Sequence, residues 1–223
     1  MNSKNNQTIN AVIFDMDGTM IDTEKIKENG WKYAGDCQNI VIDDTIISEM
    51  RGTNKEYCKE LLCKKFRNIN FKKLYNDRNE FIERYINTNG IKMKKGLIEI
   101  LRFLKNNHYK IAVASSSEEE TIRRYLTKIK ILDFFNVIVA GDMIENGKPN
   151  PEIYLKAVEE LNVPKEQCIG IEDSNSGILS VYRAGLKPIM IPDLEEPTKE
   201  VKNVLYRRMG SLLDVIKLLE NKI

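Results

Sequence analysis

The sequence contains a single histidine and no cysteine pair with the spacing of a zinc or redox motif. Its four cysteines are Cys37, Cys58, Cys63 and Cys168. Only Cys58 and Cys63 lie close to each other in the sequence. We therefore expect reduced thiols rather than a disulfide framework or a Cys/His zinc site. The histidine, His108, follows a segment with helical periodicity, and contact with the helix C-terminus is its expected role. We do not expect histidine catalysis.

The sequence also lacks a charge excess and a long apolar run. Lys and Arg number 35 against 33 Asp and Glu, which gives a formal net charge of +2. Such a balance does not favour nucleic acid or anionic lipid as a partner. No stretch reaches the roughly 18 apolar residues that span a membrane, and the first ten residues lack the apolar segment of a secretory signal. We expect a cytoplasmic protein that binds a small molecule, and the near-neutral charge permits a monomer.

Short apolar runs alternate with helical segments along most of the chain. Runs typical of buried strands cover residues 9–14, 110–114, 137–140, 168–171 and 188–191. Helical segments are expected over residues 97–106, 118–128, 151–161 and 175–184. This alternation predicts an α/β fold in which a parallel sheet carries helices on both faces.

The region from about residue 22 to residue 90 interrupts this alternation. It contains no convincing strand, but the segments NKEYCKELLCKKF and FKKLYNDRNEFIERYI have helical periodicity. The turn signals Asn89-Gly90 and Lys95-Gly96 mark the return to the sheet. We therefore expect a core of residues 1–21 and 91–223 with an inserted helical domain of residues 22–90.

Polar residues follow the expected strands. In an open α/β sheet, the loops at the carboxyl ends of the strands form the ligand site. The first strand leads to Asp15-Met-Asp-Gly-Thr, the second to Ser115-Ser-Ser and the fourth to Glu172-Asp-Ser, while Lys148 follows the third. Carboxylates, hydroxyls and one ammonium group are typical of a site for phosphate and a hard divalent cation.

Asp15 is the candidate nucleophile. A carboxylate that attacks phosphorus forms an aspartyl-phosphate and divides a difficult transfer into two easier steps. Because the attacking carboxylate and the phosphate are both negative, the site needs positive charge. Asp15 and Asp173 offer two carboxylates to Mg²⁺, which prefers oxygen ligands. Lys148 would neutralise further charge, and Ser115, with Ser116 as an additional candidate, would hold phosphoryl oxygens.

Asp17 is the candidate for proton transfer. It lies two residues after Asp15, so strand alternation predicts that both side chains point to the same side. Asp17 would give a proton to the leaving oxygen and then take one from the incoming water or hydroxyl. Gly18 permits the tight turn that directs it.

Four segments resemble, in order, the motifs of the haloacid-dehalogenase-like superfamily. They are Asp15-Met-Asp-Gly-Thr, Ser115 after a hydrophobic strand, Gly147-Lys-Pro-Asn-Pro-Glu-Ile-Tyr154 and Gly170-Ile-Glu-Asp-Ser-Asn-Ser-Gly177. The resemblance extends from residue 9 to about residue 191. Within the superfamily, the chain looks most like the branch of β-phosphoglucomutase and related sugar-phosphate phosphatases, which carry a helical cap between the first two motifs.

This resemblance implies a Rossmann-like core and an inserted helical-bundle cap domain that closes over a small phosphorylated metabolite. It implies that Mg²⁺ is held by Asp15, Asp173 and the backbone carbonyl of Asp17, with Glu172 as a further metal contact. The family also carries an Arg or Lys in the cap that reaches the substrate. In this sequence the matching candidates are Arg51 and Lys55.

Three functions are compatible with these motifs. A phosphatase is preferred, because the histidine that helps the acid-base Asp in β-phosphoglucomutases corresponds to Lys27 here. A phosphomutase of that type is the alternative. A non-catalytic protein that binds a phosphate ligand is the alternative of another class, and it is disfavoured because all the catalytic positions are present.

Overall fold

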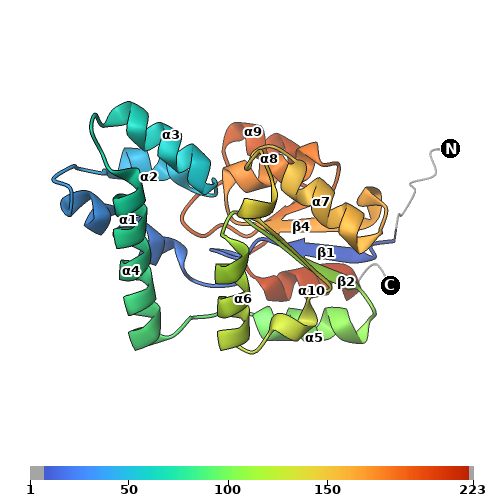
Figure 1. Cartoon of the computed structure of the whole chain (residues 1–223). Helices are drawn as coiled ribbons and strands as arrows, with labels where there is room; N and C mark the ends of the chain where they lie inside the picture. The colour runs from blue at the N-terminus through green and yellow to red at the C-terminus, as the bar shows by residue number, and fades with distance from the viewer. Residues whose placement is uncertain (1–7, 221–223) are drawn as a thin grey trace.

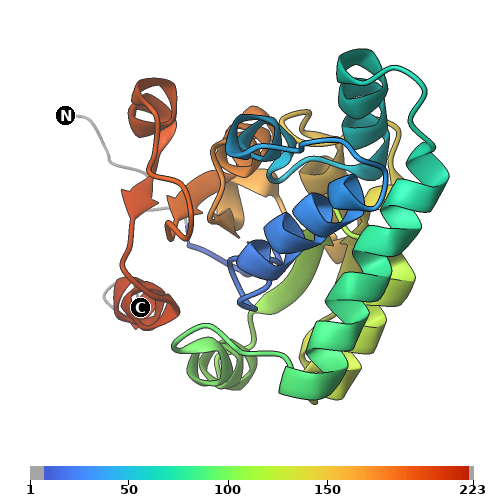
Figure 2. The ribbon, with the colours of Figure 1, turned by 90° about the vertical axis from the view of Figure 1, so that its left-hand side faces the viewer.

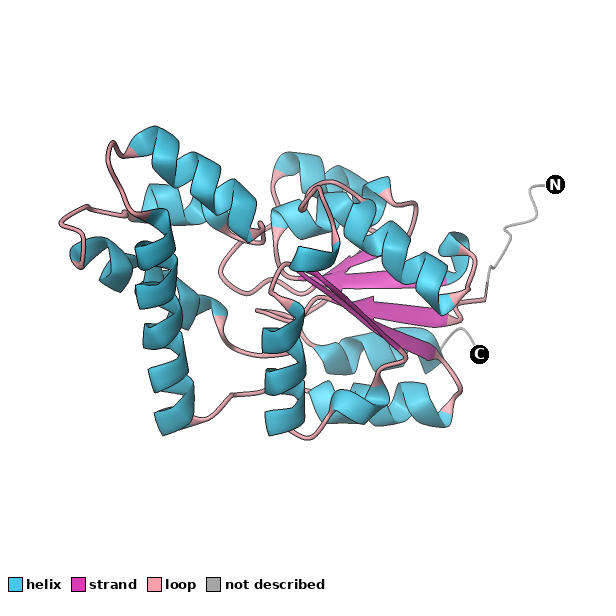
Figure 3. Cartoon of the chain, in the orientation of Figure 1, coloured by secondary structure: helices cyan, strands magenta, loops and turns pink. Residues whose placement is uncertain are grey.

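The computed structural model describes residues 8–220, and its centre is a six-stranded parallel sheet (Figures 1 and 3). The strand order is β3-β2-β1-β4-β5-β6. The strands are β1 (Ala11–Phe14), β2 (Lys110–Ser115), β3 (Val137–Ala140), β4 (Cys168–Glu172), β5 (Lys187–Met190) and β6 (Arg207–Arg208). The predicted α/β fold with a parallel sheet is confirmed.

Helices cover both faces of the sheet (Figure 1). Within the sheet region these are α5 (Leu97–Asn106), α6 (Glu119–Lys128), α7 (Glu152–Leu161), α8 (Asn175–Arg183), α9 (Lys199–Val204) and α10 (Leu212–Glu220). Short 3-10 turns occur at η1 (Leu132–Phe134), η2 (Gly141–Met143) and η3 (Lys165–Gln167). Among the described residues, no helix is both long and apolar enough to cross a membrane.

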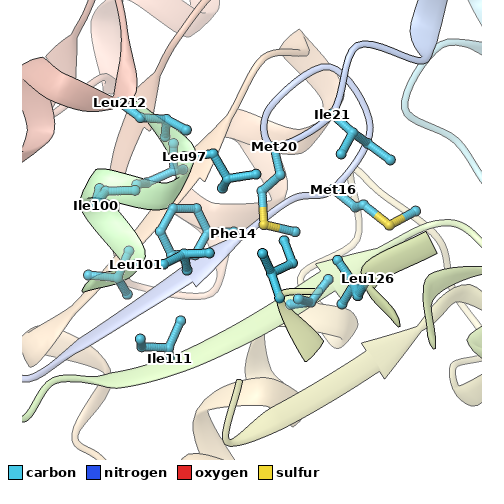
Figure 4. Close-up of a cluster of buried hydrophobic side chains, with 14 of the residues drawn as sticks. Phe14, Met16, Met20, Ile21, Leu97, Ile100, Leu101, Ile111, Leu126 and Leu212 are labelled. Atoms are coloured by element: carbon cyan, nitrogen blue, oxygen red, sulfur yellow. The ribbon is translucent and has the colours of Figure 1, made fainter. Parts of the chain in front are cut away.

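The alternation of side chains along β1 explains the two layers of helices. Val12 and Phe14 belong to one buried cluster, with α5, α6 and α10. Ala11 and Ile13 belong to another, with α7 and α8. Successive side chains of a strand point to opposite faces, so a fully apolar strand needs helices on both sides. Figure 4 shows Phe14 surrounded by Leu97, Leu101 and other side chains of the first cluster.

Four helices, which we call the cap helices, lie between β1 and α5 and to one side of the sheet (Figures 1 and 2). They are α1 (Glu24–Asp36), α2 (Asp44–Met50), α3 (Lys55–Lys65) and α4 (Phe71–Asn89). Helices α2, α3 and α4 each have an N-cap residue whose side chain accepts a hydrogen bond from a backbone N–H of the first turn. These residues are Asp43, Asn54 and Asn70. Gly90 ends α4 at a φ of 76°.

The cap helices have a buried cluster of their own, which includes Trp31, Leu62 and Leu74. Helix α4 belongs to both parts of the molecule, since Ile82 and Ile86 pack in the same cluster as the sheet residue Phe14. The predicted division into residues 1–21 and 91–223 on one side and 22–90 on the other stays a prediction.

Candidate active site

The central position of β1 brings the predicted site residues together. Phe14 is paired with Val113 of β2 on one side and with Ile171 of β4 on the other. Asp15 therefore emerges beside the ends of both neighbouring strands. Ser115 ends β2, Glu172 ends β4, and both side chains are buried together with Asp15, Asp173 and Lys148.

Lys148 connects the two strand ends. Its Nζ donates hydrogen bonds to Asp15 Oδ1 and to Glu172 Oε1, both at 2.6 Å, and to the carbonyl oxygen of Ala114 at 3.0 Å. The hydroxyl of Tyr154 donates to the same Glu172 oxygen at 2.7 Å. Burial lowers the pKa of Lys148, but the charges of Asp15 and Glu172 outweigh burial and raise it. Lys148 is therefore a fixed cation beside the candidate nucleophile.

Asp15, Glu172 and Asp173 form a compact acidic cluster, because one oxygen of each lies within 4.8 Å of the others. Burial raises the pKa of Asp15 well above its usual value, although the charge of Lys148 opposes this shift. Burial also raises the pKa of Asp173, and the charge of Asp15 adds to the increase. Three buried carboxylates against one ammonium leave an excess of negative charge that a divalent cation would compensate. Oxygen ligands of this kind fit Mg²⁺.

Two glycines allow the acidic side chains to lie so close to the backbone. A Cβ at Gly18, whose φ is +82°, would lie 2.2 Å from Asp173 Oδ2. A Cβ at Gly177 would lie 2.0 Å from the carboxyl carbon of Glu172. Both distances are far below any contact that a real Cβ makes, so a larger residue at either position would displace a carboxylate.

Asp17 has a separate set of partners. Lys27 Nζ lies 2.6 Å and Ser117 Oγ 2.9 Å from its Oδ2, while the Thr23 hydroxyl donates to its Oδ1 at 2.5 Å. Burial alone would raise the pKa of Asp17. The charge of Lys27 and these hydrogen bonds outweigh burial and hold the pKa of Asp17 below its usual value. These contacts therefore favour the ionised form of Asp17.

The two predicted phosphate-binding serines differ in their contacts. Ser115 Oγ accepts a hydrogen bond from the backbone N–H of Ser117 at 3.2 Å, so its own O–H can be donated to an anion. Ser116 Oγ donates to the carbonyl oxygen of Gly52, in the loop between α2 and α3, at 3.0 Å. The contact of Ser116 with phosphate stays a prediction, and its hydroxyl serves here to join the sheet to the cap helices.

A cavity of about 290 Å³ lies between this site and the cap helices. This volume is at the lower end of the range for small-molecule sites. Residues from the carboxyl edge of the sheet, from α1, α3 and α4 and from the loop after α2 line it, among them Asp15, Asp17, Ser115, Asp173, Lys27, Trp31, Arg51, Lys55 and Arg78. The cavity thus lies directly in front of the candidate nucleophile.

The two predicted cap residues line this cavity, and each pairs with a carboxylate. Arg51 forms ion pairs with Glu28 and with Glu195, the latter at 3.1 Å. Lys55 lies 2.8 Å from Glu118, at a half-exposed position, and 4.5 Å from the centre of the Tyr75 ring. Their contact with substrate stays a prediction.

Arg78 of α4 lines the same cavity and was not predicted. Its guanidinium lies 4.7 Å from the centre of the Trp31 ring. Its Nε is buried and, within residues 8–220, has no hydrogen-bond partner.

The sequence also did not assign three partners of the acidic residues, which are Thr23, Ser117 and Tyr154. Tyr154 closes the motif that contains Lys148, and this proximity in sequence was the only available signal for it.

A parallel sheet with a buried polar cluster at its carboxyl edge is the arrangement in which open α/β proteins bind ligands. The chain belongs to the haloacid dehalogenase-like hydrolases, because the model of this family matches residues 12–191. It is therefore an enzyme of the phosphatase or phosphomutase kind found in that family.

Individual relatives agree with this assignment. The chain is 31% identical to a phosphorylated carbohydrates phosphatase from Thermotoga maritima, over 80% of this chain and 83% of the relative. It is 30% identical to the β-phosphoglucomutase of Bacillus subtilis, over 79% of this chain and 80% of the relative. A solved β-phosphoglucomutase from Clostridium difficile has the same fold, with a TM-score of 0.82, 24% identity and coverage of 96% and 97% of the two chains.

Proposed function

We propose that this chain is a Mg²⁺-dependent phosphatase that hydrolyses a small phosphorylated sugar through an aspartyl-phosphate (acyl phosphate) intermediate on Asp15. The observation that carries the proposal is the surroundings of Asp15. Its carboxylate lines the cavity, and an oxygen of it lies 2.6 Å from Lys148 Nζ and within 4.8 Å of oxygens of two further buried carboxylates. The phosphatase from T. maritima supports a phosphorylated carbohydrate as the substrate class.

The chemistry proceeds in two transfers at phosphorus. An oxygen of Asp15 forms a bond to the phosphorus atom while the bond to the sugar oxygen breaks, and Asp17 gives its proton to that oxygen. Water then attacks the phosphorus atom, Asp17 takes a proton from it, and phosphate leaves Asp15 unchanged. Lys148 and the Ser115 hydroxyl hold the phosphoryl oxygens during both steps.

Asp17 starts ionised, takes up a proton that arrives with the substrate and gives it to the sugar oxygen in the first step. The proton that Asp17 takes from water in the second step leaves with the phosphate, which restores the ionised starting state. Lys27 favours the ionised form of Asp17, which suits the second step, where a base is needed. The proton needed in the first step can arrive with the substrate, because a phosphate monoester has a second pKa of about 6.

Asp15, Asp173, Glu172 and the backbone carbonyl of Asp17 are the groups that we propose as ligands of Mg²⁺. When bound, the ion supplies positive charge that reduces the repulsion between the carboxylate and the phosphoryl group. Glu172 also accepts hydrogen bonds from Lys148 and Tyr154, and these contacts fix the orientation of its carboxylate beside the proposed metal site.

A phosphomutase is the second candidate, and the B. subtilis relative supports it. The ion pair between Lys27 and Asp17 favours the phosphatase, because β-phosphoglucomutases have a histidine in place of Lys27 to assist the acid-base Asp. Lys27 carries a charge that does not titrate near neutral pH, since Asp17 and Glu24 outweigh its burial and raise its pKa. A protein that binds phosphate without catalysis would not need the nucleophile, the lysine and the acid-base carboxylate in one cavity.

Phosphate release from a panel of sugar phosphates tests the proposal. The wild-type chain should release phosphate from at least one sugar phosphate with Mg²⁺ present and none in EDTA, and Asp15→Asn should be inactive. Failure with every sugar phosphate would contradict the proposed function. Conversion of glucose 1-phosphate to glucose 6-phosphate faster than phosphate appears would select the phosphomutase.

A further inference from the structure

A loop of the cap helices lies directly on the core loops that carry the site. Arg51 and Gly52 follow α2, and their carbonyl oxygens accept hydrogen bonds from Ser176 at 3.4 Å and from Ser116 at 3.0 Å. Gly52 has a φ of +70°, and a Cβ there would lie 2.6 Å from Ser176 Oγ and 2.7 Å from Ser174 Oγ. The absence of a side chain at Gly52 allows this close approach.

The Arg51 side chain extends the contact to Glu195, in the segment between β5 and α9. Its Nη1 lies 3.1 Å from Glu195 Oε1. The other oxygen of Glu195 accepts hydrogen bonds from the backbone N–H and the side-chain amide of Asn175, at 3.2 and 2.8 Å. Asn175 is the first residue of α8 and lies two residues after Asp173. One carboxylate therefore joins the cap loop to the loop that carries a proposed metal ligand.

The two partners of Arg51 have different roles. Glu28 belongs to α1, so it accompanies Arg51 in any movement of the cap helices and keeps the guanidinium in place. Glu195 belongs to the core, so its ion pair exists only when the loop is docked. The side chains of Arg51 and Glu195 are 16% and 18% exposed, which leaves their attraction less screened than that of the half-exposed pair of Lys55 and Glu118.

We infer that Glu195 is a positioning residue that holds the cap helices in the docked position through its ion pair with Arg51, which we call the latch. In this view Arg51 contributes to the latch and does not contact the substrate. The inference rests on the proposed function only for its kinetic consequence. Docking completes the cavity around the reacting groups, so a weaker latch reduces the fraction of protein ready for catalysis.

The kinetic test is a double-mutant cycle on kcat/KM. Glu195→Gln should lower kcat/KM about tenfold, the size expected when one hydrogen bond between charged groups is weakened. Arg51→Gln should lower it similarly, and adding it to Glu195→Gln should change kcat/KM by less than about twofold. Glu196→Gln is the matched control, because this neighbouring carboxylate pairs with Arg208 on the surface. It should retain wild-type kcat/KM.

Two kinetic results would overturn the latch. The first is a loss in Glu195→Gln no greater than that in Glu196→Gln. The second is a full additional loss from Arg51→Gln in the Glu195→Gln background, which would mean that Arg51 acts on the substrate directly.

A distance measurement tests the latch independently of catalysis. Spin labels can be placed on Cys63, which is exposed in α3, and at Arg102→Cys in α5, after Cys37→Ser removes the other exposed thiol. Glu195→Gln should lengthen and broaden the distance distribution, whereas Glu196→Gln should not. Unchanged distances would refute the latch even in an active phosphatase. Changed distances in a chain that hydrolyses no sugar phosphate would keep the latch and reject the proposed function.

Discussion

At the scale of single residues, Asp15 and Asp17 illustrate how neighbours separate the roles of two similar acids. Asp15 contacts Lys148 but lies among carboxylates, and burial raises its pKa. Asp17 is equally buried but has Lys27 and two hydroxyl donors, which lower its pKa. Asp17 is thus poised to act as a base, whereas Asp15 needs further positive charge, such as that of a divalent cation, to be the ionised carboxylate that attacks phosphorus.

The substitution Asp17→Asn tests this separation of roles. It removes the proton-transfer group while keeping the size of the side chain and the backbone carbonyl proposed to bind the metal. We expect kcat to fall about 10²- to 10⁴-fold, the usual contribution of general acid-base catalysis. Affinity for Mg²⁺, measured by calorimetry, should change little. Wild-type kcat in this variant would remove Asp17 from the mechanism.

The sequence predicted the site residues that directly follow strands, because the carboxyl ends of neighbouring parallel strands always meet at one edge. Asp15, Ser115 and Asp173 are of this kind. It did not predict that Thr23 and Ser117 would contact Asp17, because those contacts depend on where α1 and the start of α6 lie relative to the sheet. Side-chain hydroxyls of this sort are common in loops, and nothing in their spacing distinguishes them.

At the scale of elements, the turn after β1 places Gly18 against Asp173. Gly18→Ala should displace the Asp173 carboxylate, lower the affinity for Mg²⁺ and reduce turnover, since the new Cβ would lie 2.2 Å from Oδ2. Gly90→Ala is the control, because Gly90 also has a positive φ, +76°, but its Cβ would meet no atom within 4 Å. Backbone strain alone should lower the free energy of unfolding of both variants by roughly 1 to 3 kcal/mol, which urea unfolding would measure. Equal Mg²⁺ affinity in the two variants would refute the steric argument.

The elements with a clear apolar pattern were predicted within one or two residues. The strands β1 to β5 and the helices α5 to α8 belong to this group. The short strand β6 was missed because it consists of two exposed arginines, Arg207 and Arg208, and carries no apolar signal. Helix α10 was also not predicted. Leu212, Val215 and Leu219 have the spacing of a buried helix face, but they lie beyond the segment that resembles the family motifs.

At the scale of the whole molecule, a metal ion bound at the buried acidic cluster would couple metal binding to stability. A ligand that binds only the folded state at 100 times its Kd adds about 2.7 kcal/mol to the free energy of unfolding. For a chain of this length, that corresponds to an increase in Tm of roughly 5 to 10 °C. We expect Mg²⁺ to raise Tm by this amount and EDTA to reverse the change.

Substitutions at two aspartates locate the source of this stabilisation. Asp173→Asn should abolish the Mg²⁺-dependent increase in Tm, because it removes one of the three clustered carboxylates. Asp214→Asn should retain the increase, since Asp214 pairs with Lys217 on the surface of α10. An equal effect of Mg²⁺ on both variants, followed by scanning calorimetry, would place the bound ion elsewhere.

The central claim is that Asp15 carries the phosphoryl group during turnover, and trapping that intermediate tests it most directly. The chain is mixed with a sugar phosphate that it hydrolyses and with Mg²⁺, quenched in acid within the first turnover, and digested for peptide mass spectrometry. The account predicts one added phosphoryl group on Asp15 in the wild-type chain and in Asp17→Asn, and none in Asp15→Asn. A phosphoryl group on another residue, or a labelled peptide that persists in Asp15→Asn, would contradict it.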